Sequence, residues 1–340
     1  MAERVSDVGE FGLIRRISDL LSREGLHSDR VTLGIGDDTA SFLPREGYEV
    51  LLTCDSMVEG RHYLPRYTKP FDLGARAMTL NISDIGAMGG RPLYALVSLG
   101  LKGEAAVADI EEMYRGFLAE LNPLGASVIG GNLTKSRDTF IDITLIGEVE
   151  KGKGVRRSGA GAGDFIFVTG YPGQAAAGLQ LLSRDPENPE LLSDPLVRIY
   201  IKPTHRAPLG RAIGQAGCAT AMIDTSDGFL GDLGHICEES SLGAELMMEN
   251  IPLNEKLRSA AHQLNCDPRD FFLGESDDYE LIVTCRPEDA ERLEAVVRES
   301  GEIPLARVGT MTEKAEGIFL VLPDGSRRAA KALSWDHFRL

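Results

Sequence analysis

The sequence lacks several features that would place it in a familiar class. No apolar run approaches the ~20 residues that a membrane-spanning helix needs, so we expect no membrane association. The first residues carry acids and contain no apolar core, which is unlike a secretory signal and predicts a cytoplasmic protein. The five cysteines are widely separated and form no Cys-x-x-Cys pair, which argues against a disulfide framework and a zinc site. We expect reduced, mostly structural cysteines.

The best-known nucleotide-binding and hydrolase motifs are also missing. The chain has no Gly-x-x-x-x-Gly-Lys-Ser/Thr loop, no His-Arg-Asp segment and no Gly-x-Ser-x-Gly elbow. Gly159–Gly163 resembles a phosphate-binding loop, but it precedes a predicted strand instead of following one, so we interpret it as a linker. The histidines are scattered without the spacing of a zinc site or an acid–base pair. These absences favour chemistry with little proton transfer, such as phosphoryl transfer.

Basic residues are too few to balance the acids. The chain has 36 Lys and Arg against 52 Asp and Glu, which gives a formal net charge of −16. Such a charge repels nucleic acid and anionic membranes, so we expect small ligands and no nucleic-acid partner. An acidic protein that binds an anionic nucleotide needs metal ions and a few local cations to do so.

The length of 340 residues predicts two domains. The clearest change in composition is a Gly-rich, basic stretch between Glu148 and Asp164, and we place the boundary there, with domains at 1–150 and 151–340. Hydrophobic periodicity predicts helices over 10–23, 73–88, 107–121 and 287–298, a helix from Gln174, and strands over 141–145, 165–169 and 281–285. Because helices and strands mix without strict alternation, we predict an α+β fold.

Four acidic segments are the most informative feature that is present: Gly34–Asp38, Leu51–Ser56, Asn81–Gly86 and Ile223–Gly228. Each sets carboxylates beside an apolar run or a glycine. Any one of them alone is an ordinary turn or helix-cap signal. Four together favour a site for Mg²⁺, because this ion takes oxygen ligands. We expect the carboxylates at the ends of buried elements, and we expect short strands to carry the first two segments. Phosphate chemistry is the corresponding hypothesis.

Longer stretches around these segments resemble thiamine-monophosphate kinase, a family of the aminoimidazole-ribonucleotide synthetase superfamily. The resemblance rests on Glu10–Ile14, Gly34–Asp38, Asp55–His62, Asn81–Gly89, Gly130–Thr134, Arg157–Ala160, Ile223–Gly228, Asp278–Leu281 and Trp335–Phe338. It implies an N-terminal, sheet-rich domain that binds ATP and metal and pairs in a homodimer, a C-terminal α+β domain, and ATP held between them. The implied reaction is the ATP-dependent phosphorylation of thiamine monophosphate to thiamine diphosphate by direct, Mg²⁺-assisted transfer.

The resemblance also implies roles for individual residues, none of them catalytic beyond positioning metal and phosphate. The implied Mg²⁺ ligands are Asp38, Thr53, Cys54, Asp55, Asp84, Asn132, Asp224 and Asp227. The implied ATP contacts are Gly131, Asn132, Arg157 and Ser226. The implied contacts to thiamine monophosphate are His62, Asp277 and Trp335.

This chain departs from the family pattern at four positions. Asn132 replaces a charged ligand, which predicts weaker metal binding there, and Cys54 stands where a hydroxyl is usual. Asp277 replaces a glutamate and Ser276 a glycine, which predicts a changed substrate pocket. Two alternatives stay open: another ATP-using member of the superfamily with a different acceptor, and a catalytically weakened nucleotide-binding homologue.

Overall fold

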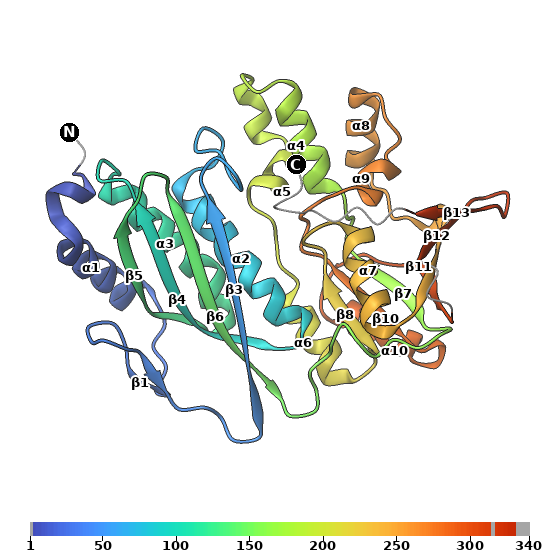
Figure 1. Ribbon diagram of the computed structural model, residues 1–340, viewed down its shortest axis with the longest axis horizontal. Helices are drawn as coiled ribbons and strands as arrows, with labels where there is room; N and C mark the ends of the chain where they lie inside the picture. Colours follow the sequence, from blue (N-terminus) through green and yellow to red (C-terminus); the bar gives the residue numbers. More distant parts are fainter. Residues whose placement is uncertain (1–2, 314–316, 331–340) are drawn as a thin grey trace. The chain divides into compact units, whose positions relative to one another are not determined.

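The computed structural model describes residues 3–313 and 317–330, which divide into two compact units (Figure 1). The first unit is Met1–Ile85 with Gly90–Gly152, and the second is Gly86–Gly89 with Lys153–Leu340. The four residues Gly86–Gly89 belong to the second unit, whereas the division of the sequence at residue 150 groups them with the first. Gly86 lies so close to Ala207 that a Cβ atom there would come 2.4 Å from the Ala207 Cα atom. None of the described helices is both long and apolar enough to span a membrane.

The first unit is built on a four-stranded sheet in the order β3-β6-β4-β5, with β3 and β5 at its edges. The strands are β3 (Tyr48–Val58), β4 (Arg91–Leu101), β5 (Ser127–Lys135) and β6 (Phe140–Glu150). Strand β6 pairs antiparallel with β3 and β4, and β4 pairs parallel with β5. A separate two-stranded sheet joins β1 (Val31–Leu33) to β2 (Ser41–Phe42). The 141–145 strand prediction is confirmed by β6.

The helices of the first unit are α1 (Val5–Glu24), α2 (Pro70–Ala87) and α3 (Val107–Leu121), and the 3-10 turn η1 (Asn122–Leu124) follows α3. Figure 1 shows α2 and α3 on one face of the four-stranded sheet. Both helices begin and end close to the predicted residues. Helix α1 begins before the predicted residue 10, because a kink at Gly9, with a φ of 68°, joins a short first turn to the predicted helix. Glycine adopts this φ at little cost.

The two faces of the four-stranded sheet have different surroundings. Ile141, Ile143 and Leu145 of β6 are fully buried. Alternation along β3 places Thr53 and Asp55 on this covered side and Cys54 on the other side, where it is exposed. The prediction of short strands for the first two acidic segments was wrong: Leu51–Ser56 lies inside the 11-residue strand β3, and Gly34–Asp38 forms the turn after β1.

The second unit is built on a seven-stranded sheet in the order β13-β12-β9-β11-β7-β10-β8. Its strands are β7 (Phe165–Thr169), β8 (Ala221–Asp224), β9 (Gly243–Met247), β10 (Leu281–Cys285), β11 (Leu305–Thr312), β12 (Ile318–Val321) and β13 (Arg327–Ala330). Only the β9–β12 pair is parallel among the described strand pairs of this sheet. The strands predicted over 165–169 and 281–285 are confirmed by β7 and β10.

The helical elements of the second unit are α4 (Gln174–Arg184), η2 (Pro189–Ser193), α5 (Pro195–Ile201), α6 (Ala207–Ala216), α7 (Phe229–Ser240), η3 (Met248–Asn250), α8 (Glu255–Leu264), α9 (Arg269–Leu273), η4 (Pro287–Asp289) and α10 (Ala290–Glu299). The helix predicted from Gln174 is confirmed. The single helix predicted over 287–298 was wrong at its start, because Pro287 opens a separate 3-10 turn before α10.

The central strands of the seven-stranded sheet are buried on both faces. Ile166 and Val168 of β7 pack in one cluster with residues of α7, whereas Phe167 packs in a second cluster with residues of α6 and α10. Strands covered on both faces are apolar along their whole length, which explains why β7 and β10 are continuous apolar runs in the sequence. The two clusters fix the strand ends from which the acidic loop of this unit departs.

The Gly159–Gly163 segment is not the free linker that the sequence predicted. The amides of Gly159 and Ala160 donate to the Ser240 hydroxyl, both at 3.3 Å, and the Gly163 amide donates to the Met311 carbonyl at 2.8 Å. These bonds fasten the segment to α7 and β11. The glycines serve close packing here, since a Cβ atom at Gly159 would lie 2.7 Å from the Thr220 carbonyl oxygen.

Contact between α2 and α3 generates a stability prediction. A Cβ atom at Gly116 of α3 would lie 2.2 Å from the Phe71 carbonyl oxygen of α2. We expect Gly116→Ala to lower the free energy of unfolding by about 1–3 kcal/mol through overpacking, although alanine has the higher helix propensity. Urea unfolding checks this. Gly103→Ala is the control, because a Cβ atom there meets only Ser6 Cβ, at 3.9 Å; equal stability of both variants would contradict the expectation.

Candidate functional site

The Asp224–Gly228 loop connects β8 to α7 in the second unit. Asp224 is the last residue of β8 and is buried, whereas Ser226 and Asp227 are half-buried in the loop. Gly228 ends the loop with a φ of 112°, and a Cβ atom there would lie 2.4 Å from the Gly274 carbonyl oxygen. Only glycine fits this turn. The loop therefore has a fixed path that holds two carboxylates and a hydroxyl at the end of a strand.

A third carboxylate, that of Asp232, lies beneath this loop. It is buried in α7, and one of its oxygens, Oδ2, accepts the amides of Asp227 at 3.2 Å and Gly228 at 3.1 Å. Burial, together with the negative charges of Asp224 and Asp227, raises the pKa of Asp232 to about 8. Sequence reasoning missed Asp232, although an acid inside the apolar run Phe229–Leu233 was a signal for it. The raised pKa reflects burial of the carboxyl first and the two neighbouring acids second.

Thr225, between Asp224 and Ser226, fastens the loop to the segment that precedes β10. The Thr225 amide donates to the Glu280 carbonyl at 2.8 Å, and the Tyr279 amide donates to the Thr225 carbonyl at 2.9 Å. The Thr225 hydroxyl accepts the Glu280 amide at 3.0 Å. The acidic loop and the segment that carries Asp277 are thus held together by three hydrogen bonds.

Thr53, Asp55 and Asp84 share one side of the sheet in the first unit. The Thr53 hydroxyl donates to the Asp84 carboxylate, and Asp55 follows Thr53 by two residues on the same side of β3. Asp84 is half-buried on α2. Asn81, predicted to share its helix face, is fully buried and donates to the Ala77 carbonyl at 3.1 Å. Asp55 lies inside β3 and Asp84 inside α2. The prediction that carboxylates stand at the ends of buried elements is therefore confirmed for Asp224 and wrong for these two residues.

Cys54 lies on the opposite side of the sheet from Asp55. Its thiol donates to the Asp142 carboxylate at 3.3 Å and accepts the Thr144 hydroxyl at 3.6 Å. The Thr144 hydrogen bond lowers the pKa of Cys54, but partial burial and the neighbouring acids outweigh it and raise the pKa above its ordinary value. The free thiol is therefore protonated at neutral pH, and sulfur is a poor ligand for a hard cation such as Mg²⁺.

Asn132 also lies away from Asp55. It is exposed on the edge strand β5, where it pairs with Ser98, which in turn pairs with Asp142 of β6. Asp142 accepts the Ser56 hydroxyl at 2.6 Å and was missed by sequence reasoning, although its place in an alternating strand was a signal. Gly131, before Asn132, lies so close to β4 that a Cβ atom there would be 1.9 Å from the Val97 carbonyl oxygen.

The turn that carries Asp38 is anchored to the sheet on both sides. The buried Glu148 of β6 accepts Arg30 at 3.1 Å and Arg91 at 2.7 Å, and the Phe42 ring packs on Tyr94 with 5.0 Å between centroids. Asp38 itself is exposed. Across the described ranges, no group of three or more His, Cys, Asp or Glu side chains is arranged to hold a metal ion by itself.

The remaining predicted contacts lie in loops. His62 follows β3, and its Nδ1 accepts the Val58 amide at 3.0 Å, so a neutral His62 carries its proton on Nε2. Asp277 is half-buried before β10. Arg157 is exposed and forms no salt bridge with a described residue. Trp335 lies outside the described residues.

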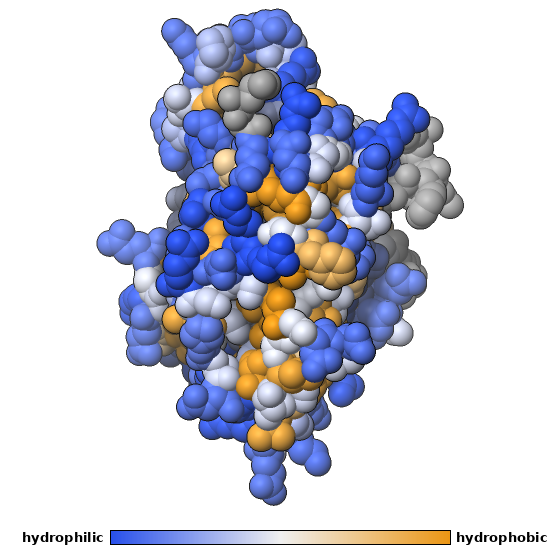
Figure 2. Space-filling view, turned by 90° about the vertical axis from the view of Figure 1, so that its left-hand side faces the viewer, coloured by the Kyte–Doolittle hydropathy of each residue, from blue (hydrophilic) through white to orange (hydrophobic). Residues whose placement is uncertain are grey.

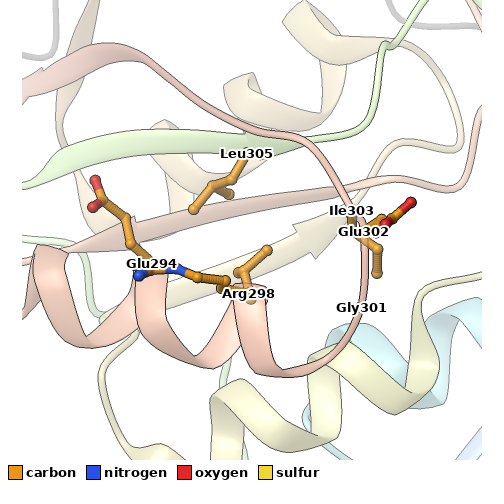
Figure 3. Close-up of a pocket in the computed structure, with 7 residues that line it drawn as sticks. Glu294, Arg298, Gly301, Glu302, Ile303 and Leu305 are labelled. Carbon is orange, nitrogen blue, oxygen red and sulfur yellow. The ribbon is translucent and has the colours of Figure 1, made fainter.

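Two surface cavities lie apart from the carboxylates. One of about 550 Å³ in the second unit is lined by Glu294, Val297, Arg298, Gly301, Glu302, Ile303 and Leu305, along α10 and the segment after it (Figure 3). One of about 430 Å³ in the first unit lies among the end of α1, β1, β5 and Gly34–Ile35. Figure 2 shows apolar side chains gathered in a band on the face that lies at the left of Figure 1. Neither cavity is lined by a residue that the sequence assigns to the site.

The raised pKa of Asp232 predicts a pH dependence of stability without metal. The unfolded carboxyl ionises near its ordinary pKa of 3.8, whereas the folded one keeps its proton up to about 8, so the free energy of unfolding falls as pH rises between these values. Asp232→Asn keeps an oxygen for both amides and removes the charge. We expect this variant to lose about 1.4 kcal/mol per pH unit from the downward slope of the free energy of unfolding between pH 5 and 7. Urea unfolding across pH measures this, with the exposed Glu302→Gln as control; parallel profiles would refute it.

Comparisons with known proteins find matches along nearly the whole chain. Residues 36–149 match the N-terminal domain, and residues 161–321 the C-terminal domain, of the AIR synthase related proteins. Thiamine-monophosphate kinase of Bacillus subtilis (strain 168) is 32% identical over 97% of this chain and 99% of its own length. The crystal structure of the same enzyme from Stenotrophomonas maltophilia K279a is 33% identical with a TM-score of 0.80, covering 95% of this chain and 98% of that one. A structure described as AaThiL complexed with AMPPCP and TMP is 32% identical with a TM-score of 0.75, covering 99% of this chain and 100% of that one. The chain therefore belongs to the thiamine-monophosphate kinase family.

Proposed function

We propose that this protein catalyses the ATP-dependent phosphorylation of thiamine monophosphate, with thiamine diphosphate and ADP as products. One observation carries the proposal: the chain matches, over 99% of its length, a kinase of known structure in complex with the ATP analogue AMPPCP and with TMP. Curated relatives at 32% to 35% identity over 90% or more of this chain bear the same enzyme name. ATP is accordingly the co-substrate.

The chemistry requires little of the protein beyond positioning. The second pKa of a phosphate monoester is about 6, so the acceptor is largely ionised at neutral pH and needs no general base. One of its oxygens forms a bond to the γ-phosphorus of ATP. The bond from that phosphorus to the β–γ bridging oxygen breaks, and ADP leaves with the electron pair. The main barrier is the repulsion between two anions.

We propose that the carboxylates of both units hold Mg²⁺ ions. The first unit offers Asp38, Asp55 and Asp84 with the Thr53 hydroxyl, and the second offers Asp224 and Asp227. The donor set fits this metal, because Mg²⁺ takes oxygen ligands and usually binds through one or two carboxylates, water and substrate phosphates. When bound, Mg²⁺ neutralises charge on the phosphates. Asn132 would contribute a neutral oxygen, and Cys54 its backbone carbonyl, since sulfur is a poor ligand for a hard cation.

We assign the remaining predicted residues to the two substrates. Gly131, Arg157 and Ser226 would contact ATP, where an exposed guanidinium can bind phosphate with two hydrogen bonds. His62, Asp277 and Trp335 would contact thiamine monophosphate. The proton on Nε2 of His62 suits an anionic phosphate. The negative charge of Asp277 suits the cationic thiazolium, as does an aromatic face at Trp335.

We also propose a homodimer that forms through the four-stranded sheet, and a cytoplasmic location, where ATP is supplied. The observation behind the dimer is strand β3, an edge strand of 11 residues that carries exposed apolar side chains. Leu52 is 68% exposed and Val50 is 43% exposed. An exposed edge strand of this length is a template for pairing with a second chain.

Incubation of the purified protein with ATP, Mg²⁺ and thiamine monophosphate tests the function. We expect thiamine diphosphate and ADP in equal amounts by mass spectrometry. We expect Asp84→Asn to lower kcat by about 100-fold, because it removes a charged metal ligand. Asp138→Asn, in the exposed turn between β5 and β6, should retain full activity. ATP hydrolysis without thiamine diphosphate would instead indicate a different acceptor.

Asn132 provides a separate test, because it motivates the alternative of a weakened homologue. We expect Asn132→Asp to lower the Mg²⁺ concentration for half-maximal rate by about threefold to tenfold, since a carboxylate binds this ion more strongly than an amide oxygen. Titration of the initial rate with Mg²⁺ measures the change. If neither the wild type nor the Asn132→Asp variant shows turnover, the result would favour the nucleotide-binding alternative.

A further inference from the structure

The five residues Ser276–Glu280 connect several parts of the second unit. Their burial alternates at the start of the segment: Ser276 and Asp278 are 8% and 5% exposed, whereas Asp277 between them is half-buried. Tyr279 is buried with a φ of 55°, which a non-glycine residue adopts only where its surroundings enforce it. Asp277 therefore lies between two buried residues on a backbone with a forced path.

The first anchor is the N-terminus of α4. Its N-cap residue is Gly173, so the helix has no capping side chain of its own. The Asp278 carboxylate accepts the amides of Gly173 at 2.5 Å and Ala175 at 2.8 Å. The Ser276 hydroxyl accepts the Ala176 amide at 3.1 Å and donates to Asp278 at 2.6 Å. Two side chains from a distant segment thus satisfy three amides that the helix leaves without partners.

The second anchor is at the other end of the segment. The Arg206 guanidinium donates to both oxygens of Glu280, at 2.7 and 2.5 Å, and the Thr169 hydroxyl donates to the same carboxylate at 2.6 Å. Together with the three bonds to Thr225, these contacts hold residues 279 and 280 independently of α4. Loosening the Ser276 contacts therefore loosens the backbone on the α4 side of Asp277 and leaves the bonds to the loop that carries Ser226 and Asp227 in place.

We infer that Ser276 and Asp278 are positioning residues that fix Asp277 for the acceptor by clamping it to the N-terminus of α4. The inference rests on the proposed function, in which Asp277 contacts thiamine monophosphate. Its consequence is selective. Loss of the clamp should weaken acceptor binding, whereas the nucleotide side of the site, held through Thr225 and Glu280, should keep its affinity.

Ser276→Ala tests the clamp, since it removes one hydroxyl from two hydrogen bonds. We expect the KM for thiamine monophosphate to rise about tenfold, with kcat and the KM for ATP within about twofold of wild type. Asp278→Asn should raise the KM for thiamine monophosphate further, because its amide NH₂ group then faces a backbone amide. Isothermal titration with thiamine monophosphate, in the presence of AMPPCP and Mg²⁺, should report the same ordering without turnover.

Asp194→Ala is the matched control. Asp194 caps α5 by accepting the amides of Leu196 at 2.8 Å and Val197 at 3.3 Å, so its loss costs helix stability without touching the segment. We expect it to lower the melting temperature and to leave both KM values unchanged. Two results with an active wild type would overturn this inference and leave the proposed function standing. In the first, the Ser276→Ala and Asp278→Asn variants keep the wild-type KM for thiamine monophosphate. In the second, they lose affinity for both substrates alike. A wild type that neither binds nor phosphorylates thiamine monophosphate would overturn the proposed function and this inference with it.

Discussion

Three carboxylates at the end of β8, those of Asp224, Asp227 and Asp232, repel one another, and the surrounding structure is organised to keep them in place. Ionising Asp232 carries a cost from burial and from its two neighbours, which raises its pKa to about 8. The amides of Asp227 and Gly228 offset part of that cost by donating to it. A carboxylate cluster of this kind needs a rigid support, and a bound cation would stabilise it further.

The rigid support is the seven-stranded sheet, whose central strands are covered on both faces. Strand β10 lies between β7 and β8, so the acidic loop after β8 and the segment before β10 emerge next to each other. Thr225 and Glu280 then join them by hydrogen bonds that run in both directions. Because these bonds are buried, breaking them would leave amides without partners, and the cost of that keeps the Asp224–Gly228 loop and the segment before β10 in one arrangement. Positioning of this kind is the main contribution a protein makes to phosphoryl transfer.

Much of the fold could be predicted from the sequence, but the pairing of site residues could not. Strands β7 and β10 were predicted to the residue because strands buried on both faces are uninterrupted apolar runs. Alternation in β3 separates Cys54 from Asp55, which a list of motif residues does not convey. Thr225 acts through backbone groups of the segment before β10, 55 residues away along the chain, and a sequence shows no partner for such a contact. The Gly159–Gly163 segment was misjudged for the same reason, since its bonds go to Ser240 and Met311.

The net charge of −16 gives the carboxylates a further consequence. Both substrates are anions, so the protein repels them at long range and must recover their binding energy at short range. Described donors suited to phosphate include the exposed guanidinium of Arg157 and the Nε2 proton of a neutral His62. If the protein holds the Mg²⁺ ions that we propose, those ions offset the repulsion between its carboxylates and the two phosphates. Under that proposal the acidic loops, which repel nucleotides when they hold no cation, are the places where nucleotides bind. The same proposal accounts for Asn132, because one of several ligands can be neutral while the remaining carboxylates hold the metal.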